Sequence, residues 1–235
     1  MIKKKPQRMC VSCRTKAEKK DLIDHSPVRY FDNATKAGLK AGEMGLVTAK
    51  KGLGKTSVLV QFGIDTLLND KALVHVSFDQ QSSNVISWYS SILAEIAKKK
   101  NFNLDDVNEE IVRNRTILNF NQETFTLPKV VNTIKALKEG GIKIDMVVVD
   151  GLALDKIENK DLECFAKFIK SEKMTSWFSF TSESAELKKT LPEDKLNAFS
   201  TIAHLAAEGK DLGLSILKNG EGTVKLDSKT LLFTK

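Results

Sequence analysis

Residues 49–56 combine residue types and a spacing that suit the binding of phosphate groups. The segment reads Ala-Lys-Lys-Gly-Leu-Gly-Lys-Thr. Its two glycines, Gly52 and Gly54, lie on either side of Leu53, directly before Lys55-Thr56. Glycine allows the backbone to curl so that several N–H groups point inward at an anion. The ammonium of such a lysine reaches the β and γ phosphates of a nucleotide, and the threonine hydroxyl ligates Mg²⁺. This is the Walker A pattern, with Ala49 in place of its first glycine, and it predicts a site for ATP.

The sequence on either side supplies the elements that must position this loop. Met44–Ala49 is a short apolar segment typical of a buried strand, and apolar residues recur at helical spacing from Lys55 to Leu68. A helix that begins at Lys55 adds the positive end of its dipole to the phosphate site. A Gly-Lys-Thr triplet arises by chance in a lysine-rich chain, but this strand-loop-helix context favours a true site. The predicted nucleotide-binding residues are Ala49, Lys50, Lys51, Gly52, Leu53, Gly54, Lys55, Thr56 and Ser57.

A second acidic signal lies downstream of this loop. Three valines at 147–149 lead directly into Asp150, which is the pattern of a Walker B strand that delivers a carboxylate at its carboxyl end. Such a carboxylate holds Mg²⁺ while the phosphate loop holds the nucleotide. An aspartate after an apolar strand is often only a strand end, but here alternating strands and helices separate it from Lys55. We therefore predict a Mg²⁺ site formed by Thr56 and Asp150.

The rest of the chain alternates between the two kinds of element. Such alternation implies an α/β fold with a mostly parallel sheet that helices cover on both faces. The C-terminal part differs, because three short segments there are typical of adjacent strands joined by tight turns. Residues 101–126 are polar, and we expect a mixture of helix and loop. The expected elements are a strand at 71–78, a helix around 85–96, a helix from Pro128 to Gly140, a strand at 144–149, a helix at 159–170, a strand at 174–181, and strands at 213–219, 222–227 and 230–234.

Length and composition place the chain in a broad class. Its 235 residues and 41% hydrophobic content suit one ordinary domain with a small appendage. We find no apolar run long enough for a membrane span and no signal peptide, and three cysteines do not make a disulfide framework. We therefore expect a cytoplasmic protein with reduced thiols that does not act at a membrane.

The net charge of +7 is confined to one end of the chain. Residues 1–20 contain eight Lys or Arg and a single acid, Glu18, so the remaining residues are neutral overall. A basic arm attracts polyanions such as single-stranded DNA or RNA through counterion release, although a solvated terminal tail carries the same signature. Pro27 favours a break near the end of this arm. We predict a basic N-terminal arm at 1–28 and an ATP-binding core at 29–235.

Residues 30–235 resemble the RecA-type ATPases of the DnaB, KaiC and RadA/Sms group. The turn Gly38-Leu-Lys-Ala-Gly-Glu43 before the first core strand is typical of that group, and residues 215–226 are similar to the C-terminal hairpin of DnaB and KaiC proteins. Residues 76–85 also resemble the DnaB segment after the second strand. The resemblance implies a RecA-like fold with a C-terminal antiparallel hairpin. It also implies assembly into rings, so that a hexamer is the expected homo-oligomer.

Two departures from the family pattern bear on catalysis. The family glutamate that polarises the attacking water is replaced by Asp79, whose side chain is one methylene shorter. The family's Lys-x-Arg pair, which reaches the nucleotide of the neighbouring subunit, is reduced to Lys218, because Gly220 stands at the arginine position. The resemblance also implies a polar residue that orients water at the end of strand 174–181, either Thr181 or Ser182. The implied catalytic residues are Lys55, Asp79 and Asp150, with Lys218 as a further contact to nucleotide.

The basic arm carries a Cys-x-x-Cys pair, Cys10 and Cys13, that resembles the start of the small RNA-binding YlxR family. It also resembles half of the zinc ribbon that precedes the ATPase core in RadA/Sms proteins. Structural zinc takes four ligands, and no second cysteine pair follows. His25 is a candidate third ligand, whereas Cys164 lies in the middle of a predicted helix and we expect it in the core. We therefore expect a Zn²⁺ shared between two chains, or no metal, in preference to a site within one chain.

Two function hypotheses follow for the whole chain. The first is a slow Mg²⁺-dependent ATPase that acts on or near nucleic acid. The second is a nucleotide-gated switch or assembly module that hydrolyses little ATP, which Asp79 and the missing arginine favour. His75 and His204 lie in apolar segments, and we expect both to be packed in the core.

Overall fold

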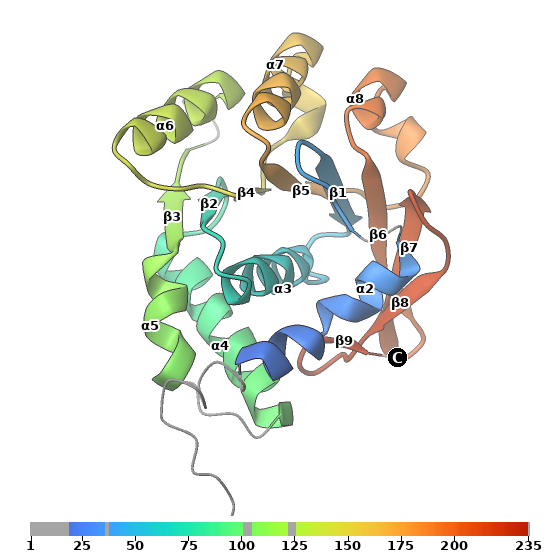
Figure 1. Cartoon of the computed structure of the whole chain (residues 1–235). Helices are drawn as coiled ribbons and strands as arrows, with labels where there is room; N and C mark the ends of the chain where they lie inside the picture. Colours follow the sequence, from blue (N-terminus) through green and yellow to red (C-terminus); the bar gives the residue numbers. More distant parts are fainter. Residues whose placement is uncertain (1–18, 36–37, 101–104, 122–125, 235) are drawn as a thin grey trace, which may run out of the picture.

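The computed structural model describes residues 19–35, 38–100, 105–121 and 126–234, and Figure 1 shows its arrangement. Residues 19–24 are helical and precede the first labelled element. The helices are α2 (Val28–Ala34), α3 (Lys55–Leu68), α4 (Ser82–Lys100), α5 (Asp105–Arg113), α6 (Leu127–Glu139), α7 (Asn159–Ser171) and α8 (Glu193–Asn197), with short 3-10 turns at Leu154–Lys156 and Leu187–Lys189. The strands are β1 (Met44–Ala49), β2 (Leu73–Ser77), β3 (Arg115–Asn119), β4 (Met146–Asp150), β5 (Thr175–Thr181), β6 (Thr201–Glu208), β7 (Asp211–Lys218), β8 (Thr223–Leu226) and β9 (Phe233–Thr234).

These strands form one sheet in the order β3-β2-β4-β5-β1-β6-β7-β8-β9. The first six strands in that order pair in parallel, and β6 to β9 pair antiparallel. This arrangement confirms the predicted RecA-like α/β fold with an antiparallel C-terminal hairpin. Ligands in such folds bind beyond the carboxyl ends of the parallel strands. The strands β1 and β4 therefore carry the phosphate loop and Asp150 to the same edge of the sheet.

Helices cover both faces of the sheet, with α6, α7 and α8 on one side and α2, α3, α4 and α5 on the other (Figure 1). Every residue of β1, β2 and β4 is buried, as expected for parallel strands between two helical layers. Their side chains alternate between two apolar clusters. Val47 and Val148 face the α3 layer, whereas Leu46 and Val149 face the α6 and α7 layer. None of the helices within the described ranges is long and apolar enough to cross a bilayer.

The region that we expected to be mixed helix and loop contains an additional strand. β3 pairs in parallel with β2, from Leu73 with Arg115 to Ser77 with Asn119, at the edge of the sheet. Four of its five residues are only partly buried and the last is exposed. A half-buried edge strand needs no continuous apolar run, so the sequence pattern that reveals β2 and β4 is missing from β3.

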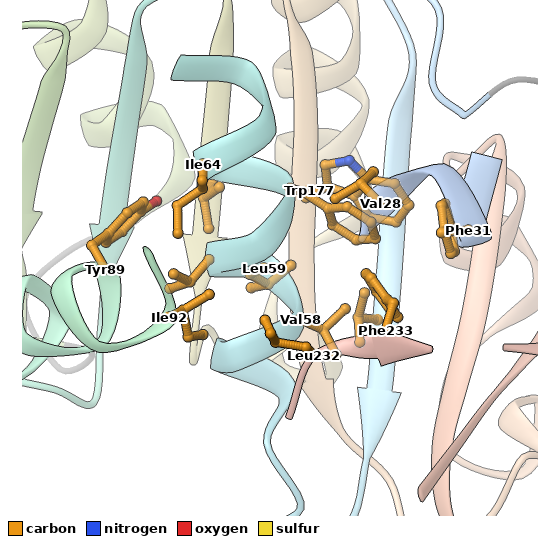
Figure 2. Packing of buried hydrophobic residues seen from close by; sticks show 14 of the residues in the cluster. Val28, Phe31, Val58, Leu59, Ile64, Tyr89, Ile92, Trp177, Leu232 and Phe233 are labelled. Carbon is orange, nitrogen blue, oxygen red and sulfur yellow. The ribbon is translucent and has the colours of Figure 1, made fainter. Parts of the chain in front are cut away.

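The helix α2 is part of the core. Phe31 is buried, and its ring centroid lies 4.8 Å from that of Phe62, 5.6 Å from that of Trp177 and 6.1 Å from that of Phe233. Figure 2 shows Phe31, Trp177 and Phe233 close together beside α3. Phe31 therefore joins α2 to α3, to the sheet and to the C-terminal strand.

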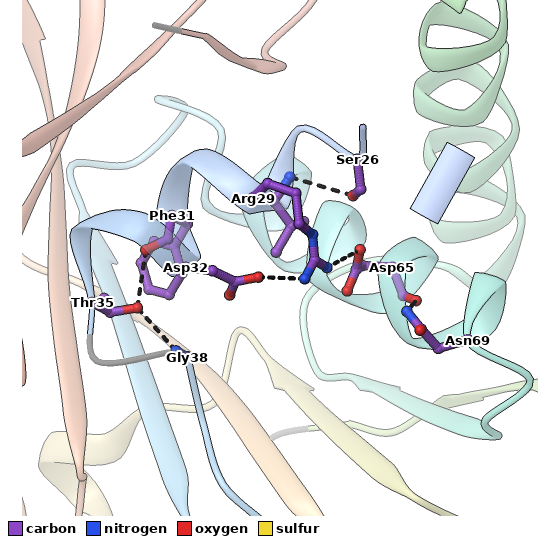
Figure 3. Close-up of polar contacts among 9 residues, drawn as sticks. Ser26, Arg29, Phe31, Asp32, Thr35, Gly38, Asp65 and Asn69 are labelled. Atoms are coloured by element: carbon purple, nitrogen blue, oxygen red, sulfur yellow. Dashed lines mark hydrogen bonds and ion pairs between the residues drawn. The ribbon is translucent and has the colours of Figure 1, made fainter. Parts of the chain in front are cut away.

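An ion-pair network fixes the exposed side of the same helix. Arg29 donates through Nη1 to Asp32 at 2.7 Å and through Nη2 to Asp65 of α3 at 2.5 Å (Figure 3). Leu22, in the preceding helical segment, is also buried in the cluster around α3. The segment before β1 is therefore anchored to the core both by apolar packing and by charge.

Replacing Phe31 with leucine is expected to lower the free energy of unfolding by about 1 kcal/mol or more, because each aromatic pair contributes roughly 0.5–1.5 kcal/mol beyond burial. Urea unfolding followed by circular dichroism measures this loss. Tyr30→Leu is the matched control, because Tyr30 is the adjacent aromatic residue and is 37% exposed. Equal stability of the two variants would contradict the role given to Phe31.

Candidate nucleotide-binding site

The loop between β1 and α3 has the conformation that its glycines predict. Gly52 has φ +84° and Gly54, the residue before the first turn of α3, has φ +104°, in the left-handed region where glycine is favoured. Lys55 folds back over this loop, so that its Nζ lies 3.4 Å from the carbonyl oxygens of both Ala49 and Lys50. The amino end of α3 and the Lys55 ammonium thus face the same space.

Burial lowers the pKa of Lys55, and the charges of Asp150 and Asp79 oppose that shift. Its ammonium is half-buried and is held by carbonyl oxygens at long range. A phosphate group would supply the close negative charge that stabilises such an ammonium. The position of Lys55 therefore suits the recognition of a nucleotide phosphate.

Asp150 lies at the carboxyl end of β4 and is almost fully buried. Its Oδ2 accepts a hydrogen bond from Thr56 Oγ1 at 2.7 Å, and its Oδ1 accepts one from Ser179 Oγ at 2.5 Å. Burial by itself raises the pKa of Asp150, but the adjacent imidazole of His75 and the two hydroxyl donors outweigh burial and lower it. The carboxylate is therefore ionised at neutral pH.

Thr56 and Asp150 fit a Mg²⁺ ion. Mg²⁺ in nucleotide sites is bound through one or two carboxylates together with substrate phosphates and water. The structure brings one carboxylate and one hydroxyl into direct contact at the rim of the loop, as the sequence predicts. Thr56 and Asp150 would hold Mg²⁺ there, and the ion would supply positive charge that neutralises the phosphates.

A cavity of about 780 Å³ opens beside these residues, within the usual size range of small-molecule sites. Its lining includes residues from the loop, from β4 and from β5, and also Trp88 of α4. The predicted site residues that line it are Lys51, Gly52, Gly54, Lys55, Thr56, Ser57, Asp79 and Asp150.

Four predicted residues lie outside the lining of this cavity. Ala49 is fully buried at the end of β1, and Leu53 packs against the core cluster. Lys50 is exposed and lies 3.4 Å from Glu183. Lys218, on the hairpin, is near the carbonyl of Leu196 at 3.4 Å, so within one chain it is remote from the phosphate loop.

Asp79 follows β2 and lines the cavity opposite the loop. Burial and the charge of Asp150 raise its pKa, although part of the residue is exposed, and Lys55 and Lys51 partly oppose the shift. Its carboxylate lies against Gly151, where a Cβ would come within 2.2 Å of Asp79 Oδ1. Gly151 (φ +79°) therefore leaves room for the Asp79 side chain next to the Walker B strand.

The two candidates for a water-orienting residue differ in their surroundings. Thr181, at the end of β5, is exposed and lines the cavity. Ser182 is buried, and its hydroxyl donates to the carbonyl oxygen of Ser184 at 2.7 Å. Thr181 therefore faces the space where a nucleotide would lie, whereas the Ser182 hydroxyl has a local structural partner.

The proposed zinc ligands Cys10 and Cys13 lie outside the described residues. Within the ranges that the structure describes, no group of three or more His, Cys, Asp and Glu residues is arranged to hold a metal ion. Cys164 lies on α7 and is exposed, contrary to the core position expected from its place in the helix.

Sequence reasoning missed two parts of the site. Ser179 of β5 donates to Asp150 and accepts a hydrogen bond from the Gly151 N–H at 2.9 Å. Leu231, near the C-terminus, lines the cavity, and its side chain would lie 3.3 Å from a Cβ at Gly54. A polar residue within the buried strand β5 was the available signal for Ser179, whereas the sequence contains no signal for Leu231.

The C-terminal segment is held in this place by one side chain of α3. Gln61 donates to the carbonyl oxygen of Leu231 at 2.8 Å and accepts from the N–H of Phe233 at 3.0 Å. Gln61 thereby joins β9 to the helix that starts at the phosphate loop. The far end of the chain consequently forms part of the wall around the candidate site.

Comparison with known proteins agrees with this geometry. The family model described as "ATPase: KaiC" matches residues 25–209, which is most of the chain. A comparison with curated proteins gives no match. The matched region contains the loop after β1, Asp79 and Asp150, and its fold is the RecA-like sheet that the family implies. The chain therefore belongs to the KaiC family of ATPases.

Proposed function

We propose that this protein binds Mg²⁺-ATP in the cavity beside the phosphate loop and hydrolyses it slowly. The contact between Thr56 and Asp150, 2.7 Å apart and next to the Lys55 ammonium, is the observation that carries this proposal. Lys55 would neutralise the β and γ phosphates, Thr56 and Asp150 would hold Mg²⁺, and Asp79 would position the attacking water.

Slow turnover follows from the side chains that face the γ-phosphate side of the cavity. Asp79 is shorter than a glutamate, and a misplacement of about 1 Å costs on the order of 100-fold in rate. Gly220 offers no side chain to a neighbouring nucleotide, and an arginine finger contributes roughly 10³–10⁵ in phosphoryl transfer. Both features support ATP binding with weak hydrolysis.

Replacing Asp79 with glutamate is expected to raise the ATP turnover rate by roughly 10-fold or more, because the carboxylate then reaches further into the cavity. The rate of phosphate release from Mg²⁺-ATP measures the effect, with Asp79→Asn as the control that keeps the size and removes the base. A turnover rate that is equal in the wild type and both variants would show that Asp79 does not position water.

A nucleotide-gated switch is the second candidate function, and the position of Asp79 favours it. The Asp79 carboxylate rests against Gly151 and is one methylene shorter than the glutamate of the family, so it reaches less far into the cavity. ATP binding without turnover in the wild type, together with turnover in Asp79→Glu, would favour the switch.

We also propose that the basic arm brings the protein to nucleic acid, since the net charge of +7 is confined to residues 1–20. Deleting residues 1–18 removes six of the eight basic residues and keeps Leu22, which is buried in the core. The truncated chain is expected to bind single-stranded RNA or DNA at least 10-fold more weakly at low salt, because released counterions drive such binding.

Fluorescence anisotropy of a labelled oligonucleotide at several salt concentrations measures this difference. A truncated chain that keeps the affinity and the salt dependence of the full chain would exclude the arm as the binding element.

Because Lys218 lies outside the cavity of its own chain, its predicted contact with nucleotide requires a ring in which it reaches a neighbour, and a homo-hexamer stays a proposal.

A further inference from the structure

His75 is a fully buried histidine at the centre of the sheet, on β2. Its Nε2 is one of two buried side-chain nitrogen or oxygen atoms in the described ranges that have no hydrogen-bond partner. A buried polar group without a partner is destabilising, because it has lost its hydrogen bonds to water. Retention of such an atom at the core of the fold calls for an explanation.

The unpartnered nitrogen faces the Walker B carboxylate. β2 and β4 are neighbours, with His75 opposite Val148, and Asp150 lies two residues further along on the same face of the sheet. The distance from His75 Nε2 to Asp150 Oδ2 is 3.9 Å. This exceeds hydrogen-bond distance by less than 1 Å, so a small movement of either side chain would bring the two atoms into contact.

The other side of the imidazole is fixed. His75 Nδ1 lies 3.2 Å from the hydroxyl of Tyr89 on α4, and the two rings meet edge-on with centroids 5.7 Å apart. Burial raises the pKa of Tyr89, so its phenol keeps the proton and can donate it to Nδ1. A neutral imidazole that accepts at Nδ1 carries its own N–H at Nε2. The donor of His75 therefore points at Asp150.

Tyr89 in turn has little freedom to move. Its hydroxyl lies over Gly63 of α3, where a Cβ would come within 2.4 Å of the oxygen. The guanidinium of Arg115, on β3, lies over its ring, 4.7 Å from the centroid. Figure 2 shows Tyr89 packed beside Ile64 of α3. Two elements, α3 and β3, thus hold the ring that orients His75.

We propose that His75 is a positioning residue for Asp150. When Thr56 acts as a Mg²⁺ ligand, His75 donates from its Nε2 to Oδ2 of Asp150. In the structure, Thr56 donates its only hydroxyl proton to Oδ2. A hydroxyl that ligates Mg²⁺ through an oxygen lone pair can keep this hydrogen bond, and Oδ2 has a second lone pair that can accept another donor. His75 would place its Nε2–H at that second position and fix the orientation of the carboxylate. The inference rests on the proposed function, because it concerns the same Mg²⁺-nucleotide site.

The test measures the Mg²⁺ dependence of nucleotide binding by the full chain. A fluorescent ATP analogue, mant-ATP, is titrated in EDTA and at increasing Mg²⁺. His75→Leu is expected to raise the half-saturating Mg²⁺ concentration by roughly 10-fold, because loss of a partner of a metal ligand typically weakens metal affinity 10–100-fold. The affinity in EDTA is expected to stay within about twofold of the wild type. His75→Gln keeps an N–H donor near the position of Nε2 and is expected to restore much of the Mg²⁺ dependence.

His204→Leu is the matched control. His204 is also buried in the sheet, on β6, but its Nδ1 pairs with the hydroxyl of Thr48 at 2.9 Å. An effect of His75→Leu that His204→Leu reproduces would reflect lost packing and overturn the inference. Tyr89→Phe, which keeps the ring and removes the hydroxyl, provides a second test if His75→Leu does not fold, and it is expected to shift the Mg²⁺ dependence in the same direction.

The outcomes separate this inference from the proposed function. If the wild type binds mant-ATP with a clear Mg²⁺ dependence that neither His75→Leu nor Tyr89→Phe changes, His75 has no positioning role and the proposed function stands. If the wild type binds no nucleotide, or binds it equally with and without Mg²⁺, the proposed function and the inference are both wrong.

Discussion

Lys55→Ala is expected to reduce ATP affinity or turnover by roughly 100- to 1,000-fold, the usual effect of removing one donor to a developing or bound anionic charge. Lys55 is the half-buried ammonium at the amino end of α3, and its present partners are two carbonyl oxygens at 3.4 Å. The substitution removes that charge without disturbing the glycines that shape the loop. Binding of mant-ATP and the release of phosphate both measure the effect.

Lys50→Ala is the matched control for this prediction. Lys50 belongs to the same loop and carries the same charge, but it is exposed, lies near Glu183 and does not line the cavity. The control is expected to bind ATP within about threefold of the wild type, since exposed ion pairs contribute little energy. Similar losses in the two variants would mean that general loop charge, and not the position of Lys55, recognises the nucleotide.

Asp150→Asn is expected to abolish the Mg²⁺ dependence of ATP binding and to lower turnover by roughly 100-fold or more, because the amide keeps the shape and loses the charge that a divalent cation requires. The amide has one oxygen that can accept from one of the two hydroxyls of Thr56 and Ser179, and the other hydroxyl can accept from its NH₂ group. The loss therefore concerns charge more than packing. Titration with Mg²⁺ at fixed mant-ATP measures the result.

Asp145→Asn is the control for Asp150→Asn. Asp145 lies just before the other end of β4, is exposed, and accepts a hydrogen bond from the backbone of Ala72 at 2.8 Å. This variant is expected to retain the wild-type response to Mg²⁺. Retention of that response in Asp150→Asn as well would contradict the assignment of Asp150 as a metal ligand.

The parts of the site that the sequence predicts are those encoded within short segments. One loop contains the glycines, Lys55 and Thr56, and three valines directly precede Asp150. The local sequence pattern is therefore enough to identify these residues. Parallel packing of β1 and β4 between two helical layers then follows from their continuous apolar runs. The approach of Thr56 to Asp150 is a consequence of this topology.

The parts that the sequence does not predict depend on pairing across the sheet. Ser179 reaches Asp150 because β5 lies beside β4, and His75 faces the same carboxylate because β2 lies on its other side. Neither relation follows from spacing along the chain. Leu231 lies at the phosphate loop only because Gln61 binds the C-terminal segment. The edge strand β3 escaped detection since it is only half-buried and lacks a continuous apolar run.

The most direct test of the central claim is a calorimetric titration of the full-length protein with ATP in the presence of Mg²⁺. The account predicts saturable binding of one ATP per chain, weaker binding in EDTA, and no detectable heat with Lys55→Ala under the same conditions. Absence of binding by the folded wild type, or equal binding by the wild type and Lys55→Ala, would contradict the proposal that the loop after β1 is the nucleotide site.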